Sequence, residues 1–352
     1  MAHLAVIYGT RPEWLKLASV CAALERRGHR VTAIQTGQHT DLLPLDARCD
    51  VLLQTARPEG SHDPWWYTAL IEAQVREWLI RHSVDAVVVQ GDTASAHAGA
   101  LGAHGLGIRV AHVEAGVRTG DLRDPDPEEG FRHAIDGVAT WHFPPTARQR
   151  FNLVDEGLAR EPGDAPVVGN TIVDALYQYG YDRPRQTRVP RVLVTLHRRE
   201  ARGAGFREIV AGVVAAAREH RAVEFLWPTH PNGWAVAELE ADPPPNLIRI
   251  PPVSHEAFLA LLAASWAVLT DSGGVQEEAA VLGVEAVIAR VTTDRPETVD
   301  AGFAVVTGYG RSRVAEAVEA ALLLPVRRDG FPGYGDGRTG LAIADHLSEA
   351  LP

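Results

Sequence analysis

Short apolar segments of strand length recur along the chain, and amphipathic, helix-like stretches separate most of them. This alternation is typical of β-α-β units, in which helices cover both faces of a parallel sheet. It predicts a doubly wound α/β fold. A further short strand is expected between the proline clusters of residues 241–252. The other expected strands span residues 4–8, 31–35, 86–90, 110–113, 192–196, 225–227, 267–270 and 286–289.

The chain has 352 residues, more than one hydrophobic core usually serves, so we expect two Rossmann-like domains. The alternation pauses over residues 179–190, where prolines and charges interrupt it before a new strand begins. We therefore expect a first domain over residues 1–180 and a second over 181–337, with a helix near 338–352 that packs back on the first. Ligands of such sheets bind beyond the carboxyl ends of the strands, which predicts an active site in the cleft between the domains.

Composition argues against several classes of partner. Asp and Glu number 45 against 34 Lys and Arg, and the formal net charge of −11 disfavours a nucleic-acid or anionic membrane surface. No apolar run approaches the roughly 20 residues that span a bilayer, and the opening MAHLAVIYGT lacks the features of a signal peptide. We expect a cytoplasmic protein that binds neither nucleic acid nor membrane. An anionic ligand would need a local basic pocket.

Two strand-to-helix junctions have the composition of an anion site. GTRPEWLK contains a glycine for the turn and a proline for the first helical turn, and Arg11 and Lys16 add positive charge. Such turns are common, so this junction alone is also compatible with a structural role. In DSGGVQEE, Ser272 can cap a helix while Gly273 and Gly274 let a diphosphate approach the backbone amides. A glutamate in the next turn can accept hydrogen bonds from ribose hydroxyls.

Ionisable residues are concentrated between positions 90 and 132, in the segments GDT, HVEAGVRTGD and PDPEEGFRHAID. Asp92 and Glu114 each follow an expected strand, which places both at the edge where ligands bind. Glu128 and Glu129 open a helix, where the helix dipole alone would stabilise one of them. Several carboxylates beside basic groups are what proton transfer next to an anionic leaving group requires.

The histidines and cysteines show no metal-binding pattern. His197 and His230 each follow an expected strand of the second domain, where a histidine can shuttle a proton near neutral pH, and His39 is a further candidate. Their separation differs from known zinc motifs. Cys21 and Cys49 form neither a metal spacing nor a disulfide framework. We expect no bound metal and two reduced thiols.

Taken together and in their order, the motifs resemble the non-hydrolysing UDP-N-acetylglucosamine 2-epimerase family, whose fold is of the two-domain GT-B type. The resemblance covers about residues 9 to 308. Single motifs are unspecific, but their order and spacing are highly specific. The motifs are GTRPEWLK, TGQH, QGDT, HVEAGVRTGD, PDPEEGFR, GNTIVDAL, TLHRRE, THPN, DSGGVQEEA and TTDRPE.

The resemblance implies that UDP-N-acetylglucosamine and UDP-N-acetylmannosamine are interconverted by loss of UDP, which leaves a bound 2-acetamidoglucal, and by re-addition of UDP. It implies no cofactor and a homodimer. Asp92, Glu114 and Glu128 match the acidic catalytic candidates of the family, and the identity of the base stays open. His197 matches its essential histidine. Glu278 would bind the ribose. The residues implied for the diphosphate side are Arg11, Lys16, Arg132, Ser272, Gly273 and Gly274, with Arg295 supporting the diphosphate region.

Three positions depart from the family pattern. Phe131 and Ala201 each stand where the family has Asn, and Ala280 stands where it has Pro. Since the acid, histidine and diphosphate positions all match, we expect the core reaction to be retained, with differences in substrate detail or rate.

The resemblance also bears on regulation, because bacterial members of the family can require a second UDP-N-acetylglucosamine beside the active site. The family's Arg-Gln pair for this effector would fall within residues 61–70, SHDPWWYTAL, which contain neither residue. We therefore expect turnover without the effector, unless Trp65 or Trp66 replaces the lost contact. The positions that do match this second site are Gln38, His39, Arg198 and His230.

Three other functions remain compatible with the motifs. A hydrolysing 2-epimerase would release UDP and free N-acetylmannosamine. A GT-B glycosyltransferase would keep the DSGG nucleotide site but would need an acceptor, and a nucleotide-sugar sensor would bind without turnover. The crowded acids at Asp92, Glu114 and Glu128 favour an enzyme that acts on the sugar itself.

Overall fold

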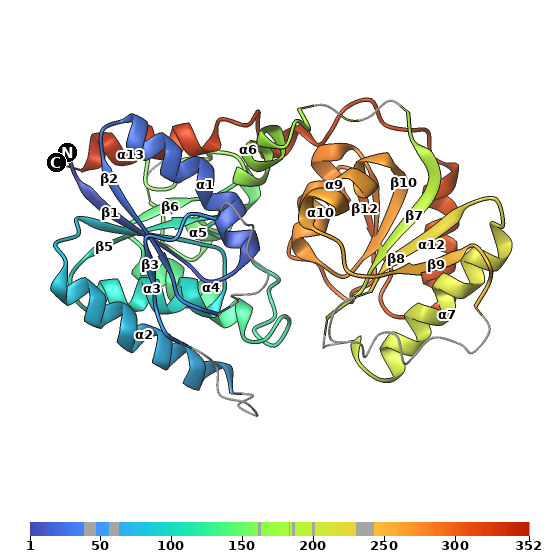
Figure 1. The fold of residues 1–352 in the computed structure, drawn as a ribbon, viewed down its shortest axis with the longest axis horizontal. Helices are drawn as coiled ribbons and strands as arrows, with labels where there is room; N and C mark the ends of the chain where they lie inside the picture. The colour runs from blue at the N-terminus through green and yellow to red at the C-terminus, as the bar shows by residue number, and fades with distance from the viewer. Residues whose placement is uncertain are drawn as a thin grey trace. The chain divides into compact units, whose positions relative to one another are not determined.

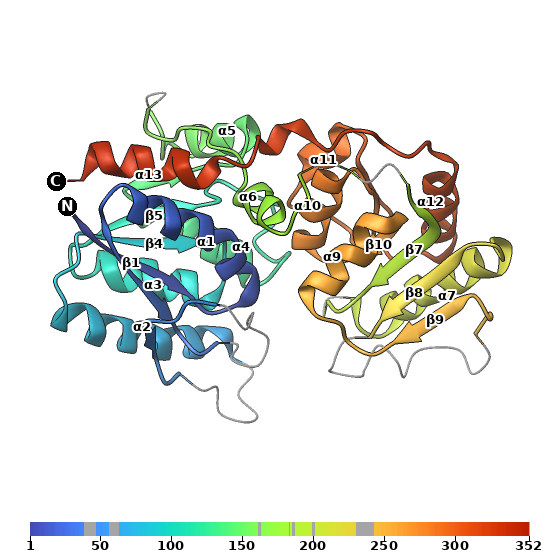
Figure 2. The same cartoon turned by 45° about the horizontal axis from the view of Figure 1, so that its top comes forward.

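In the computed structural model the chain forms two compact units, Met1–Gln178 with Gly333–Pro352, and Tyr179–Pro332. Each unit has a parallel sheet flanked by helices (Figures 1 and 2), which confirms the predicted doubly wound α/β fold. None of the described helices is long and apolar enough to cross a membrane. The structure describes residues 1–38, 47–55, 63–160, 163–182, 184, 187–198, 201–229 and 243–351.

The sheet of the first unit has the strand order β3-β2-β1-β4-β5-β6, and every described pairing is parallel. The chain runs outward from β1 to β3 and then crosses to β4 on the other side. Sheets of this kind bind ligands beyond the carboxyl ends of the strands, at this reversal of strand order. The strands are β1 (His3–Tyr8), β2 (Arg30–Gln35), β3 (Val51–Leu52), β4 (Ala86–Gln90), β5 (Arg109–Val113) and β6 (Trp141–Phe143).

Two helical layers cover this sheet because successive side chains of a strand point to opposite faces. On β1, Leu4 and Val6 pack into the cluster that contains residues of α1 and α13, whereas Ala5 and Ile7 pack with residues of α2, α3 and α4. The helices are α1 (Arg11–Arg26), α2 (Pro64–Arg81), α3 (Ala94–His104), α4 (Glu128–Val138), α5 (Ala147–Asp155), α6 (Thr171–Gln178) and α13 (Thr339–Ala350).

The C-terminal helix α13 packs against α1 and α6 of the first unit. The carboxylate of Asp174, in α6, accepts hydrogen bonds from the backbone N–H groups of Thr339 at 3.2 Å and Gly340 at 2.9 Å. A carboxylate here satisfies amides that have no partner within the helix. A Cβ at Gly340 would lie 2.7 Å from the backbone of Ser19, so glycine permits the close approach of α13 to α1.

The second unit repeats the architecture with the strand order β12-β11-β10-β7-β8-β9. Phe206 and Val213 of α7 and Val314 of α12 pack with Val192 and Val194 of β7 in one core cluster. Helices α9 and α10 contact β10. The strands are β7 (Val189–Thr195), β8 (Glu224–Pro228), β9 (Leu247–Ile250), β10 (Ser265–Thr270), β11 (Glu285–Ile288) and β12 (Ala304–Val306). The helices are α7 (Ala204–Glu219), α9 (His255–Ala264), α10 (Gly273–Leu282), α11 (Pro296–Asp300) and α12 (Arg311–Leu323), and a 3-10 turn spans Pro332–Tyr334.

Candidate active site

Glu114 follows β5 directly and has a left-handed backbone conformation, with a φ of 71°. This conformation is uncommon for a residue other than glycine, and backbone strain of this kind gathers at functional sites. The buried carboxylate of Glu114 accepts hydrogen bonds from the Nζ of Lys16 and, at 2.6 Å, from the Nε2 of Gln90. The structure therefore brings two of the predicted residues, Glu114 and Lys16, into direct contact.

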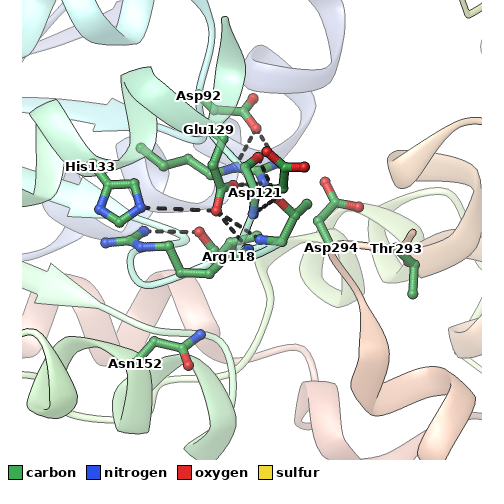
Figure 3. A network of polar contacts seen from close by, with 12 residues as sticks. Asp92, Arg118, Asp121, Glu129, His133, Asn152, Thr293 and Asp294 are labelled. Carbon is green, nitrogen blue, oxygen red and sulfur yellow. Dashed lines mark hydrogen bonds and ion pairs between the residues drawn. The ribbon is translucent and has the colours of Figure 1, made fainter. Parts of the chain in front are cut away.

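Asp92 follows β4 and forms an ion pair with Arg132 of α4. The Nε of Arg132 lies 2.8 Å from Oδ2 of Asp92, and its Nη1 lies 2.9 Å from Oε2 of Glu129. Glu129 also accepts hydrogen bonds from the backbone N–H groups of Thr119 and Gly120, in the polar network of Figure 3. Arg132 and Glu129 are buried, whereas 27% of the Asp92 side chain is exposed. The pairing thus fixes Asp92 at the sheet edge with part of its side chain accessible.

Two further predicted residues of this unit lie at helix starts. Glu128 is the first residue of α4 and Arg11 the first residue of α1, and both are half-buried. The positive end of the helix dipole favours the charge of Glu128 in any case. At the start of α1, the positive end of the helix dipole and the charge of Arg11 together favour an anion.

The buried carboxylate of Asp136, in α4, contacts residues of β5 and of the loop that follows it. Its oxygens lie 2.6 Å from Nδ1 of His112, 2.8 Å from Nη1 of Arg118 and 3.1 Å from the backbone nitrogen of Gly116. Burial by itself would raise the pKa of Asp136, but His112 and Arg118 outweigh it and hold that pKa well below its usual range. The Nε2 of His112 lies 2.9 Å from the carbonyl oxygen of Gly91. The loops after β4 and β5, which carry the two predicted acids, are therefore linked.

Glu13, in the GTRPEWLK motif, is a buried carboxylate that our sequence interpretation did not single out. It accepts hydrogen bonds from the N–H groups of Gly9 and Thr10, from the hydroxyl of Thr10, and from the hydroxyl of Thr93 at 2.6 Å. Burial raises the pKa of Glu13 to about 7, against the lowering effect of these hydrogen bonds. A Thr followed three residues later by Glu is the signature of a capping box, which could have identified it.

In the second unit, Ser272 occupies the N-cap position of α10, and Gly273 and Gly274 are its first two residues. The side chain of Ser272 makes no capping hydrogen bond, so the predicted side-chain cap is wrong. Apart from chain neighbours and the helix's own backbone, no heavy atom of the described residues lies within 4 Å of a Cβ placed at Gly274. The nearest such atom to a Cβ at Gly273 is Oδ1 of Asp294, at 3.6 Å. The start of α10 therefore offers open backbone, as an anion site requires.

The two adjacent glutamates of α10 have different partners. Glu278 is buried, and its Oε1 lies 2.7 Å from Nε2 of His255. Glu277 accepts a hydrogen bond from Nε of Arg295 at 2.5 Å. Arg295 is also buried and forms a second ion pair with Asp294. Arg295 is therefore held beside α10 by its ion pairs with Glu277 and Asp294.

His197 follows β7 and 38% of its side chain is exposed. Its Nδ1 lies 3.3 Å from Oδ1 of Asp271, and Oδ2 of Asp271 accepts hydrogen bonds from the backbone N–H groups of His197 and Arg198, both at 2.8 Å. Asp271 thus lies beside Nδ1 of His197 and also holds the backbone of this residue. Asp271 is the first residue of the DSGG motif, but the motif alone did not indicate this contact to His197.

Two of the four second-site positions, His39 and His230, lie outside the described residues. Gln38 accepts hydrogen bonds at Oε1 from the N–H of Ser95 at 3.1 Å and from its hydroxyl at 2.6 Å. Arg198 is half-buried after β7. Gln38 belongs to the first unit and Arg198 to the second.

The positions that depart from the family pattern are buried: Phe131, Ala201 and Ala280. The ring of Trp65 packs edge-on against Phe131, with centroids 4.9 Å apart, and against His97, at 5.8 Å. Burial lowers the pKa of His97 to about 4, so this histidine is neutral in the cluster. Phe131 therefore contacts a tryptophan from the very segment that lacks the family's Arg-Gln pair.

In the first unit, acids lie beside fixed cations, which suits proton transfer next to a developing negative charge. In the second unit, the start of α10 presents backbone amides that favour an anion. Within the described ranges, no three His, Cys, Asp or Glu side chains are arranged to hold a metal ion.

Comparison with known proteins identifies relatives along almost the whole chain. The family model described as UDP-N-acetylglucosamine 2-epimerase matches residues 22–348. The UDP-N-acetylglucosamine 2-epimerase of Escherichia coli (strain K12) is 34% identical, and the alignment covers 97% of each chain.

Solved structures show the same similarity in three dimensions. The UDP-GlcNAc 2-epimerase of Neisseria meningitidis, solved bound to UDP-GlcNAc, has a TM-score of 0.87 at 30% identity, covering 99% of this chain and 100% of the other. The Methanocaldococcus jannaschii enzyme, in complex with UDP-GlcNAc and UDP, has a TM-score of 0.85 at 32% identity, covering 99% of each chain. The chain therefore belongs to the UDP-N-acetylglucosamine 2-epimerase family.

Proposed function

We propose that this protein is a non-hydrolysing UDP-N-acetylglucosamine 2-epimerase, which interconverts UDP-N-acetylglucosamine and UDP-N-acetylmannosamine. Its family membership and its similarity to proteins solved with UDP-GlcNAc and UDP support the substrate class. The observation that carries the proposal is the pairing of carboxylates with fixed cations after neighbouring strands, Glu114 with Lys16 and Asp92 with Arg132.

In the proposed reaction, a carboxylate takes the proton from carbon 2 of the hexosamine. The electrons of that C–H bond form a double bond between carbons 1 and 2, and the bond from carbon 1 to the diphosphate oxygen breaks as UDP takes its electrons. An acid then protonates carbon 2 from the opposite face, and the UDP oxygen bonds to carbon 1 again. No electrons are gained or lost overall. The acids proposed for these transfers are Asp92, Glu114 and Glu128.

The cations of the first unit have a role when charge develops on UDP. Lys16 and Arg132 are paired with acids in this structure. When Glu114 or Asp92 accepts a proton, its cation loses a counter-charge and can stabilise the negative charge on the leaving diphosphate. Arg11, at the start of α1, adds to this field.

In the second unit we assign the diphosphate to the start of α10, at Ser272, Gly273 and Gly274, where backbone amides favour an anion. His197, oriented by Asp271, is placed to assist the departure of UDP. Glu278 is the proposed ribose ligand, and Arg295 supports the diphosphate region. We also propose a cytoplasmic location and, from the resemblance to the family, a homodimer.

Incubation with UDP-N-acetylglucosamine tests the non-hydrolysing reaction. We expect proton NMR to show UDP-N-acetylmannosamine, and chromatography to show far less than one UDP released for each sugar converted, because UDP returns to the intermediate. Stoichiometric release of UDP with free N-acetylmannosamine would show a hydrolysing enzyme. Transfer of sugar to an added acceptor, with no epimer formed in its absence, would show a glycosyltransferase.

We also propose that turnover does not require a second UDP-N-acetylglucosamine. Residues 61–70 supply no arginine, and Trp65 from this segment packs against Phe131 and His97. A charge-assisted hydrogen bond is typically worth about 1.5 to 3 kcal/mol, so its loss weakens the effector by roughly 10 to 150-fold.

The reverse reaction, started from pure UDP-N-acetylmannosamine, tests the requirement for an effector. We expect product to form at a constant initial rate, because no effector has to accumulate first. A pronounced lag that a trace of UDP-N-acetylglucosamine abolishes would show that the second site is retained.

A further inference from the structure

His255 and Glu278 form a buried pair in the second unit. The Nε2 of His255 lies 2.7 Å from Oε1 of Glu278, and the two side chains are only 11% and 8% exposed. His255 is the first residue of α9, and Glu278 lies in α10, which contacts α9 (Figures 1 and 2). The pair joins the nucleotide-binding helix of the proposed site to its neighbour.

The surroundings of His255 hold its ring in one orientation. A carboxylate accepts but does not donate, so Nε2 of His255 carries the hydrogen of this bond. The ring of Tyr179 packs edge-on against the imidazole, with centroids 5.8 Å apart. The Nδ1 of His255 is buried and has no hydrogen-bond partner among the described residues. Nε2 is therefore the nitrogen that orients the glutamate.

The two adjacent glutamates of α10 are anchored by different residues, and Glu278 is held by a histidine. The carboxylate of Glu277 bonds to Arg295, whose positive charge it balances. For Glu278, the described residues give Oε1 a partner and give Oε2 no hydrogen bond. A carboxylate with one oxygen anchored and the other available needs little reordering when a ligand hydroxyl donates to it.

We propose that His255 is a positioning residue that sets the selectivity of the nucleotide site for ribose. By anchoring Oε1 of Glu278, it directs Oε2 to accept a hydrogen bond from a ribose hydroxyl. This inference rests on the proposed role of Glu278. His255 therefore strengthens the binding of a nucleotide that carries this hydroxyl and has little effect on one that lacks it.

Titration calorimetry with UDP, 2′-deoxy-UDP and 3′-deoxy-UDP tests the proposal on the full-length protein. We expect the wild type to bind UDP at least about tenfold more tightly than one of the analogues, the scale of one hydrogen bond to a charged group. His255→Ala should lower the ratio of these two affinities to less than about three. The main cause should be weaker binding of UDP, because an unanchored carboxylate is no longer preorganised to accept the hydroxyl. His255→Gln, whose amide can donate in place of Nε2, should restore much of the ratio.

Two further variants separate the possible outcomes. His220→Ala removes a histidine at the end of α7 and should leave the ratio unchanged. Glu278→Gln should lower the ratio as His255→Ala does. If the wild type and Glu278→Gln bind the three nucleotides alike, the ribose role of Glu278 fails. If Glu278→Gln lowers the ratio but His255→Ala preserves it, or weakens all three nucleotides equally, the positioning role of His255 is overturned while that of Glu278 stands.

Discussion

The buried carboxylate of Asp136 is the interaction on which the arrangement of the first unit depends. An ionised carboxylate is costly to remove from water unless it is paired and hydrogen-bonded. Asp136 has such partners in His112, Arg118 and the amide of Gly116. These partners belong to β5 and the loop that follows it, whereas Asp136 belongs to α4. The pairing therefore fixes α4 relative to the strand ends, and with it the position of Arg132.

The proposed acids have different surroundings, as expected for a reaction that inverts the configuration at carbon 2. Removing a proton from one face of carbon 2 and delivering one to the other needs two acid–base groups in different environments. Glu114 is buried and bonded to Lys16 and Gln90, whereas Asp92 is partly exposed beside Arg132. Glu128 adds a third carboxylate at the start of α4. The left-handed backbone at Glu114 is a strained conformation that its buried hydrogen bonds stabilise.

Much of the fold could be predicted because its signals are local. The strands expected from apolar runs all occur, with ends shifted by a few residues, and β9 occurs within the proline-flanked segment of residues 241–252. The strands that we did not predict, β3, β6 and β12, have only two or three residues, too few for a recognisable pattern.

The contacts between side chains could not be predicted in the same way. Motifs placed Glu114 and Lys16 at strand and helix ends, but these residues are 98 positions apart, and no pattern shows that they meet. The contact of His255 with Glu278 escaped notice for the same reason. Glu13 is the exception. It bonds to Thr10, three residues earlier, and a Thr and a Glu at this spacing are the recognisable signature of a capping box.

The exchange of the proton on carbon 2 tests the central claim most directly, because exchangeable carboxyl groups are proposed to remove it and deliver its replacement. Turnover of UDP-N-acetylglucosamine in deuterium oxide is followed by NMR for the wild type and for Asp92→Asn, Glu114→Gln and Glu128→Gln. The account predicts deuterium at carbon 2 of the epimer, and a loss of turnover of about 10² or more for the variants that remove a working acid or base. An epimer that keeps its original proton in full, or near-normal turnover in all three variants, would contradict it.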